Sequence, residues 1–213
     1  MSEILLVRHG ETVWNQEGRM QGQHDSPLTD TGLRQGVQVA RRLKEVPFTT
    51  LYSSDLGRAY RTAQSIAAET GHEIVVDVRL RERHFGIFEG LTGPEMKERH
   101  PAEYVRFAAR DPDYAVPGGE SAAGFQARCI ACFDELAQRH REETVVIVAH
   151  GLVLDALYRA ASGIPLDQPR GFPLLNCSIN TFRYRHPGWS AVKVCDVDHL
   201  EEGDVTHFQG RAV

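Results

Sequence analysis

Two histidines stand in the same local context, each directly after an apolar run and directly before a glycine. His9 follows the run at residues 4–7 with Arg8 between them, and His150 follows the run at 144–149. Imidazoles can act as nucleophiles, and the planar guanidinium of an arginine matches the oxygens of a phosphate. If both runs are parallel strands of one sheet, both histidines emerge at the same edge. The pattern therefore predicts an anion site there.

Further polar side chains are expected at this edge. Arg58 lies in the first turn of a helix that follows the strand predicted at residues 48–52, with Arg61 one turn later as an alternative. Asn15 lies in the loop after the first strand and offers a neutral amide donor. Together with the histidines and Arg8, these groups describe a pocket for a dianion such as a phosphoryl group.

The elements that would position these side chains alternate between strand and helix. Strands are predicted at residues 4–7, 48–52, 74–78, 144–149, 176–184 and 191–197, and helices at 30–44, from the cap-type residues Ser53-Ser54-Asp55 to 70, at 121–140 and at 151–162. This order is typical of a largely parallel sheet covered by helices. We therefore expect an α/β fold, a three-layer α/β/α sandwich with a mostly parallel mixed sheet, formed by residues 1–213 as one domain.

The helix predicted at residues 30–44 shows how its packing face is inferred. Thr29 is a suitable N-cap residue. The apolar residues at helical spacing are Leu33, Val37, Ala40 and Leu43. We expect this stripe to face the core.

Residues 80–120 are less regular than the rest of the chain. They are rich in glycine and proline, with short helices predicted at 95–100 and 102–110. Insertions of this kind often cover a binding site. We therefore expect them to form a cap-like excursion from the sheet.

Composition and charge narrow the class of protein. Hydrophobic residues make up 41% of the 213 residues, and the formal net charge is −5. The acidic balance argues against nucleic acid or an anionic membrane as a partner, and no apolar run reaches membrane length. Because Met1-Ser2-Glu3 lacks the basic start of a signal peptide, we expect a cytoplasmic protein. A homodimer is left open as its assembly.

A pair of cysteines offers a different interpretation. Cys129 and Cys132 form a C-x-x-C motif which, with His9-Gly10-Glu11, is reminiscent of a zinc deaminase. However, Arg128 stands where that signature has a proline. The cysteines also share a helical stripe with Phe133 and Leu136, so we interpret them as buried structural thiols.

The motifs of the chain, taken in order, resemble the histidine phosphatase superfamily, also called the phosphoglycerate mutase-like family. They are Leu6-Val7-Arg8-His9-Gly10-Glu11-Thr12 with Asn15 after it, Gln21-Gly22, Asp25, Pro27-Leu28-Thr29, Ser53-Ser54-Asp55-Leu56-Gly57-Arg58-Ala59, Leu80-Arg81-Glu82 with Gly86 and Glu89-Gly90, Pro117-Gly118-Gly119-Glu120-Ser121, and Val148-Ala149-His150-Gly151. The resemblance covers nearly the whole chain. It is closest to the branch of the broad-specificity phosphatases and cofactor-dependent phosphoglycerate mutases.

The resemblance implies a role for each site residue. His9 would attack phosphorus and form a phosphohistidine, with its other ring nitrogen bonded to a backbone carbonyl. Glu82 would protonate the leaving alkoxide and then activate water. The phosphoryl oxygens would be bound by Arg8, Asn15, Arg58, His150 and the N–H of Gly151. No cofactor and no metal are implied, because cationic side chains take the metal's part.

The choice between hydrolase and mutase depends on a few positions. Glu82-Arg83-His84-Phe85-Gly86 is similar to the mutases, but Phe85 stands where they usually have tyrosine and Gly93 where they have lysine. We therefore predict a phosphatase for small phosphorylated metabolites, with a phosphoglycerate mutase as the alternative. A non-catalytic protein that binds phosphorylated ligands is the less favoured third interpretation. The organic part of the substrate is expected against Gln21, Gly22 and Phe85.

Overall fold

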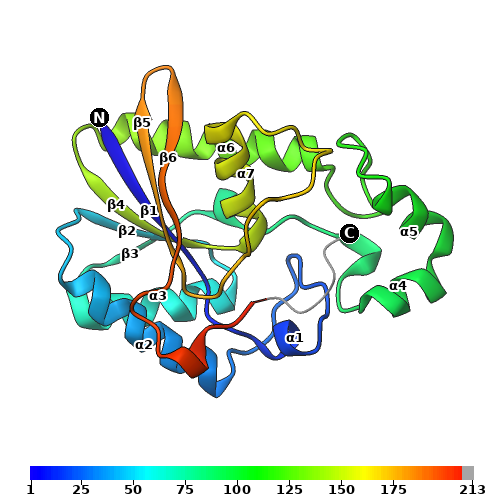
Figure 1. The fold of residues 1–213 in the computed structure, drawn as a ribbon, viewed down its shortest axis with the longest axis horizontal. Helices are drawn as coiled ribbons and strands as arrows, with labels where there is room; N and C mark the ends of the chain where they lie inside the picture. The colour runs from blue at the N-terminus through cyan, green and yellow to red at the C-terminus, as the bar shows by residue number, and fades with distance from the viewer. Residues whose placement is uncertain (208–213) are drawn as a thin grey trace.

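The strand that precedes His9 lies inside a mixed six-stranded sheet in the computed structural model, which describes residues 1–207 (Figure 1). The strands follow the order β3-β2-β4-β1-β5-β6. They are β1 (Ser2–Arg8), β2 (Thr50–Ser53), β3 (Ile74–Val76), β4 (Thr144–Ala149), β5 (Ile179–Arg185) and β6 (Gly188–Asp196). The first four pair in parallel. β5 pairs antiparallel with β1, and β6 pairs antiparallel with β5.

Helices cover both faces of the sheet. They are α1 (Val13–Gln16), α2 (Asp30–Lys44), α3 (Gly57–Thr70), α4 (Gly93–Arg99), α5 (Pro101–Ala108), α6 (Ala122–Arg139) and α7 (Gly151–Ser162), with the short 3-10 helices η1 (Val78–Leu80), η2 (Gly86–Phe88) and η3 (Glu202–Asp204). Residues alternate along β1, so that Ile4 and Leu6 pack against α6 and α7 while Leu5 and Val7 pack against α2 and α3. The predicted three-layer α/β/α sandwich with a mostly parallel mixed sheet is therefore confirmed.

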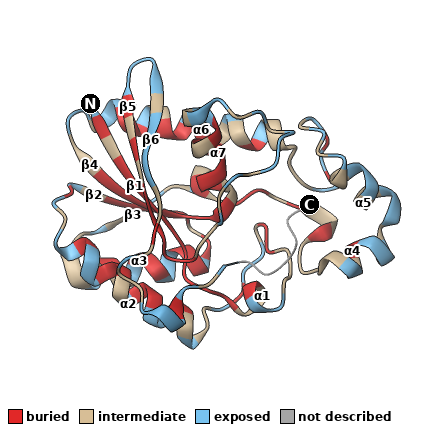
Figure 2. Cartoon of the chain, viewed as in Figure 1, coloured by how far each residue is buried: buried red, intermediate tan, exposed pale blue. Residues whose placement is uncertain are grey.

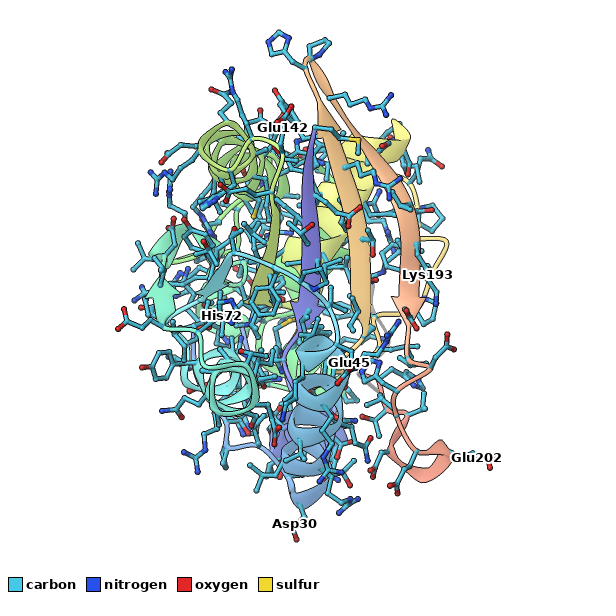
Figure 3. The ribbon with its side chains drawn as sticks, turned by 90° about the vertical axis from the view of Figure 1, so that its left-hand side faces the viewer. Asp30, Glu45, His72, Glu142, Lys193 and Glu202 are labelled. Atoms are coloured by element: carbon cyan, nitrogen blue, oxygen red, sulfur yellow. The ribbon has the colours of Figure 1, made fainter. Side chains whose placement is uncertain are left out.

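Burial follows this layered arrangement. The central strands form the most continuous buried region, whereas the outer faces of the helices are exposed (Figure 2). In the side view, Glu142, just before β4, lies at the amino end of the parallel strands, and Asp30 lies at the opposite end (Figure 3). The carboxyl ends of β1 and β4 therefore point toward the loops that lead into α1 and α7.

The packing face of α2 differs from the prediction. Leu33 and Val37 are 41% and 39% exposed, whereas small or polar residues on the adjacent face are buried. These buried residues include Gly32, Gln35 and Gly36. Small residues are needed because a Cβ on Gly32 would lie 2.1 Å from the carbonyl oxygen of Glu11. Gly32 thus packs against backbone, and Gly36 lies next to the side chain of Ser65, so this face of α2 does not pack through large apolar side chains.

The start of α3 also differs from the prediction. The helix begins at Gly57, and its N-cap, Leu56, has no side-chain cap. Ser53 belongs to β2, and Asp55 forms an ion pair with Arg81 instead of capping the helix. The helix ends as expected at Thr70, with Gly71 in the left-handed conformation.

Residues 80–120 carry η2, α4 and α5 beyond the carboxyl end of the sheet (Figure 1). They have a hydrophobic cluster of their own, which consists of Phe85, Phe88, Met96, Tyr114 and Val116. We call residues 80–120 the cap segment; that they form a cap-like excursion within the domain stays a prediction. That residues 1–213 form one domain stays a prediction, because residues 208–213 lie outside the described part of the chain. No helix in residues 1–207 has the length and apolar character needed to cross a membrane.

Candidate active site

The register of the sheet brings the two predicted histidines together. Arg8, the last residue of β1, pairs with Ala149, the last residue of β4. The residue that follows each strand is a histidine, and the ring centroids of His9 and His150 lie 5.4 Å apart. A backbone hydrogen bond from His9 N to Ala149 O, at 3.0 Å, holds the two strand ends at this spacing.

The ring of His9 is oriented by its own backbone. Its Nδ1 donates to the carbonyl of Gly10 at 2.8 Å, which is the type of bond expected from the sequence. The carbonyl of His9 in turn accepts from the side chain of Asn176 at 3.0 Å. Burial, together with the charges of Arg58 and Arg8, lowers the pKa of His9 well below its usual range. His9 is therefore neutral near pH 7, with the lone pair on Nε2.

His150 is held by the opposite nitrogen. Its Nε2 lies 2.8 Å from the hydroxyl oxygen of Ser54, and its buried Nδ1 has no hydrogen-bond partner in residues 1–207. Burial and the charge of Arg58 lower the pKa of His150 well below its usual range. The hydroxyl of Ser54 also accepts from Leu56 N at 3.3 Å. Its own proton is available to Nε2, and with Ser54 as the donor of that bond Nδ1 is an N–H donor.

Two buried arginines flank the histidines. Arg8 donates to the carbonyl of Leu174, and burial lowers its pKa to about 10. Arg58 donates to the carbonyls of His24 and Gly22, each at 2.7 Å, and pairs with Asp25 at 3.2 Å. Within residues 1–207, the buried Nε of each guanidinium has no acceptor. These backbone anchors fix both guanidinium groups beside the histidines.

Arg61, the alternative to Arg58, faces away from the site. It is exposed and donates to Gln64 at 3.3 Å. The structure therefore places only Arg58 with the two histidines.

Glu82 completes the group of ionisable side chains. Its carboxylate accepts from the backbone N–H groups of Arg83, at 2.8 Å, and Leu152, at 3.1 Å. Burial raises the pKa of Glu82, and this effect outweighs the two donors and the charges of Arg58 and Arg8. A carboxyl group held in this way can exchange a proton nearer neutral pH than a solvated one.

Asn15 and Gly151 lie at two helix starts beside this group. Asn15 is in α1, where its Oδ1 accepts from Thr12 N at 3.1 Å and from Asn176 at 3.3 Å. Its amide nitrogen is therefore turned toward the cavity that Asn15 lines. Gly151 begins α7, and a Cβ there would lie 3.4 Å from Arg8 Nε and 2.9 Å from a methyl group of Leu174. A residue without a side chain leaves room for the guanidinium.

A cavity of about 210 Å³ opens between the sheet edge and the cap segment. The predicted site residues that line it are Arg8, His9, Asn15, Gln21, Gly22, Arg58, Glu82, Phe85 and Gly151. Phe85 also stacks edge-to-face on Phe107, with centroids 6.0 Å apart. It therefore contributes both to the cavity wall and to the packing of the cap segment.

Two residues of the site carry no role in the sequence-based prediction. Ser54 orients His150, yet its position after a strand suggested only a helix cap. Asn176 bridges His9 and Asn15, but in the sequence it is simply the first residue of a predicted strand. In both cases the contact joins segments far apart in the chain, so local patterning carries little signal of it.

The cysteine pair lies away from this site. Cys129 and Cys132 are fully buried on the face of α6 that packs on the sheet, and burial raises the pKa of each thiol. This confirms their interpretation as buried structural thiols. In residues 1–207, no three or more His, Cys, Asp or Glu side chains form a group suited to a metal ion.

Comparison with known proteins defines the class. The profile described as "Histidine phosphatase superfamily (branch 1)" matches residues 4–197. "Phosphoglycerate mutase-like protein 4" of Arabidopsis thaliana is 40% identical over 205 residues, which cover 94% of this chain and 88% of that protein. "Metal-independent phosphoserine phosphatase" of the same plant is 40% identical over 203 residues, covering 94% and 84%. The chain therefore belongs to the histidine phosphatase superfamily, as the motif resemblance predicted.

A solved structure shows the same similarity in three dimensions. YhfR of Bacillus stearothermophilus has a TM-score of 0.87 and 35% identity, and the match covers 94% of this chain and 100% of that one. Phosphatase and mutase both occur among the names of similar proteins. The phosphatase interpretation of the sequence fits this family.

Proposed function

We propose that this protein hydrolyses phosphate monoesters of small metabolites through a phosphohistidine formed on His9. The observation that supports this most directly is the state of His9. Its ring is neutral, its Nδ1 is bound to Gly10, and the free Nε2 lies in a buried group that contains two arginines and a carboxyl. A neutral imidazole fixed in this way is a nucleophile, and the arginines attract the group that it attacks.

The reaction proceeds in two displacements. In the first, His9 Nε2 forms a bond to phosphorus while the bond to the ester oxygen breaks, and protonated Glu82 gives its proton to the departing oxygen. In the second, the Glu82 carboxylate takes a proton from water, whose oxygen attacks phosphorus and releases His9 and inorganic phosphate. The raised pKa of Glu82 suits both roles, because the carboxyl can hold and then accept a proton.

The remaining site residues bind the phosphoryl oxygens. Arg8 and Arg58 supply positive charge through their unengaged Nε groups, and His150 supplies the Nδ1 proton that its contact with Ser54 leaves available. The Asn15 amide and the start of α7 at Gly151 add neutral donors. Fixed donors of this kind stabilise charge that develops in the transition state, which is the main requirement of phosphoryl transfer.

A phosphoglycerate mutase is the second candidate. The name of the relative "Phosphoglycerate mutase-like protein 4" favours it. Arg83 also lies in the cavity wall next to Glu82. A mutase must keep its phosphohistidine from water until a second phosphoglycerate binds. Phe85 and Gly93, which replace the tyrosine and lysine usual in mutases, favour the hydrolase instead.

A substrate panel tests the proposal. The purified protein is given an aryl phosphate and 3-phosphoglycerate, with and without 2,3-bisphosphoglycerate, and inorganic phosphate and isomers are measured. We expect phosphate release that does not need the bisphosphate and that persists in EDTA. Isomer formation dependent on the bisphosphate would identify a mutase, and no turnover of any ester would leave a binding protein.

A further inference from the structure

Glu89 is a buried carboxylate of the cap segment that takes no part in the two displacements. Its side chain is 1% exposed, yet it does not line the cavity. No arginine or lysine in residues 1–207 forms an ion pair with it, and the imidazoles of His24 and His84 lie 3.7 and 3.6 Å away. Because a charge is costly to bury, a carboxylate in this position needs compensating contacts.

Those contacts are three backbone N–H groups from two segments. Oε1 of Glu89 accepts from Gln23 N and from Phe85 N, each at 2.9 Å. Oε2 accepts from His24 N at 3.2 Å. Phe85 belongs to the cap segment, whereas Gln23 and His24 lie in the loop between α1 and α2. Glu89 therefore joins residues 22–24 of that loop to the cap segment.

The close approach of this carboxylate depends on a glycine. Gly22 has a φ of 55°, which lies in the left-handed region. A Cβ there would lie 2.0 Å from Oε1 of Glu89. A side chain at this position would displace the carboxylate, so glycine is what allows it to reach the backbone of the loop.

The same stretch of loop holds the guanidinium of Arg58. One peptide group joins Gly22 to Gln23. Its N–H is bonded to Glu89, and its C=O accepts from Nη2 of Arg58 at 2.7 Å. Nη1 of Arg58 donates to the carbonyl of His24, also at 2.7 Å. One peptide group thus lies between a carboxylate and a guanidinium, and each charge polarises it in the sense that strengthens the other bond.

The electrostatics of Arg58 support the same connection. Arg58 is 2% exposed, and burial lowers its pKa. The charges of Glu82, Asp25 and Glu89 oppose this effect. However, Glu82 loses its charge when it is protonated for the first displacement, and the side chain of Asp25 is 42% exposed. Glu89 is the buried negative charge of this set that takes no part in proton transfer.

We propose that Glu89 is a positioning residue for Arg58. It holds the loop whose carbonyls accept from Arg58, and so fixes the guanidinium beside the phosphoryl group. This inference rests on the proposed phosphatase function, in which Arg58 binds the phosphoryl oxygens. Because every ester shares the phosphoryl group, loss of this contact should affect all esters alike.

Glu89→Gln tests the role, because it keeps the size of the side chain and removes its charge. One terminal oxygen becomes an NH2 group, which then faces at least one backbone N–H as a second donor. For an aryl phosphate at one pH, kcat/KM should fall by roughly 10- to 100-fold, the range of a hydrogen bond to a charged group. The dissociation constant of inorganic phosphate should rise. The ratio of kcat/KM for an aryl and an alkyl phosphate should stay as in the wild-type protein.

A double-mutant cycle separates positioning of Arg58 from a general role in folding. Arg58→Gln removes the guanidinium, so adding Glu89→Gln should then lower kcat/KM by less than about 2-fold. The dissociation constant of inorganic phosphate gives the same cycle without turnover. Equal losses in the two backgrounds, or no loss in the wild-type background, would overturn the inference. If Glu89→Gln does not fold, Glu89→Asp, which keeps the charge but is one methylene group shorter, replaces it and the same outcomes decide.

Glu95→Gln is the matched control. Glu95 also joins the cap segment to the loop after α1, through an ion pair with Arg19 at 2.7 Å. Its hydrogen bonds are made with Arg19 and Thr92 and not with residues 22–24. This variant should leave kcat/KM and the dissociation constant of phosphate within about 2-fold of the wild-type values. A loss as large as that of Glu89→Gln would show that any weakened link to the cap segment suffices, which contradicts the inference.

The wild-type protein separates this inference from the function on which it rests. If it hydrolyses the aryl phosphate but the losses from Glu89→Gln and Arg58→Gln are additive, the phosphatase function stands and the positioning role is wrong. If it hydrolyses neither ester, the phosphatase function is wrong, and the inference falls with it.

Discussion

His9 and His150 lie side by side but are held through opposite ring nitrogens; His9 lines the cavity, whereas His150 is fully buried and does not line it. His9 donates from Nδ1 to Gly10, so its Nε2 carries a lone pair. His150 meets Ser54 through Nε2, and with Ser54 as the donor its Nδ1 carries the proton. One ring can attack phosphorus while the other donates to a phosphoryl oxygen. The difference comes from the hydrogen-bond partner of each ring and not from the residue type.

Glu82→Gln tests the proton-transfer role at the level of one atom pair. The substitution removes the acidic proton. We expect hydrolysis of an alkyl phosphate to slow by roughly 10²- to 10⁴-fold, the usual contribution of a general acid or base. The first displacement with an aryl phosphate should slow much less, because its leaving oxygen needs little protonation. Equal slowing of this step for both esters, measured in single-turnover experiments, would rule out the acid role.

The pH dependence of kcat/KM has a predicted sign at each end. Glu82 must be protonated at the start, so kcat/KM for an alkyl phosphate should fall as pH rises through its pKa, which burial places above the usual carboxyl range. His9 must be neutral, so the acid limb should lie below the usual pKa of histidine. In Glu82→Gln the alkaline limb should disappear. If the alkaline limb stays at the same pH in this variant, it belongs to a group other than Glu82.

Much of the candidate site could be predicted from residue types alone. His9, His150, Arg8 and Arg58 stand next to strand ends or helix starts, where parallel topology brings side chains together. Glu82 is different, because only the motif resemblance distinguishes it from a surface carboxylate. Its burial depends on the N–H groups of Arg83 and Leu152, and the second of these comes from a distant helix.

At the scale of elements, the turn after β1 is held by a close approach of backbones. A Cβ on Gly10 would lie 2.5 Å from Gly32 O, and one on Gly32 would lie 2.1 Å from Glu11 O. The side-chain oxygen of Gln35 accepts a hydrogen bond from Glu11 N at 2.8 Å. The start of α2 therefore fixes the segment that follows His9.

Gly32→Ala should disturb both stability and activity. The added methyl group meets backbone that cannot rotate away, so we expect a loss of roughly 1–3 kcal/mol in the free energy of unfolding. Activity should fall because the turn that orients His9 shifts. Gly93→Ala is the control, since nothing lies within 4 Å of a Cβ there. It should raise the free energy of unfolding by roughly 0.4–1 kcal/mol in denaturant titrations. If both variants changed the free energy of unfolding by a similar amount, the argument would be contradicted.

The element boundaries show where sequence-based prediction succeeds and fails. Thr29 and Gly71 mark helix ends because their side-chain and backbone chemistry is local. The exposed positions of Leu33 and Val37 could not be predicted, because the approach of Glu11 to Gly32 joins two separate segments. Apolar spacing gives the period of a helix, but tertiary contacts decide which face is buried.

At the scale of the molecule, the hydrophobic clusters fall into two groups, those on the faces of the sheet and the one in the cap segment. The clusters on the two faces of the sheet hold the strand ends that precede the histidines and the start of α3 that carries Arg58. The smaller cluster of the cap segment holds the opposite wall of the cavity. We expect the cap segment to determine which leaving groups fit, while the sheet edge performs the chemistry.

Phe88→Ala tests whether the cap segment has stability of its own. Phe88 is fully buried and packs edge-to-face on Phe107 at 5.5 Å. Its removal should lower the free energy of unfolding by roughly 3–5 kcal/mol. The cap segment should be destabilised more than the sheet. Hydrogen exchange should become faster in η2, α4 and α5 and stay slow in β1 and β4. Val105→Ala, at a position that is 68% exposed, should leave exchange as in the wild-type protein. Uniform acceleration across the sheet would show one cooperative unit instead.

The central claim is that His9 carries the phosphoryl group between substrate and water. It is tested most directly by mixing Glu82→Gln with an aryl phosphate, quenching in alkali and locating the phosphoryl group by mass spectrometry of peptides. In this variant the second displacement lacks its base, so a phosphoenzyme should accumulate with the phosphoryl group on His9. A His9→Ala variant should show neither a phosphorylated peptide nor turnover. A phosphoryl group on another residue, or substantial hydrolysis by His9→Ala, would contradict the account.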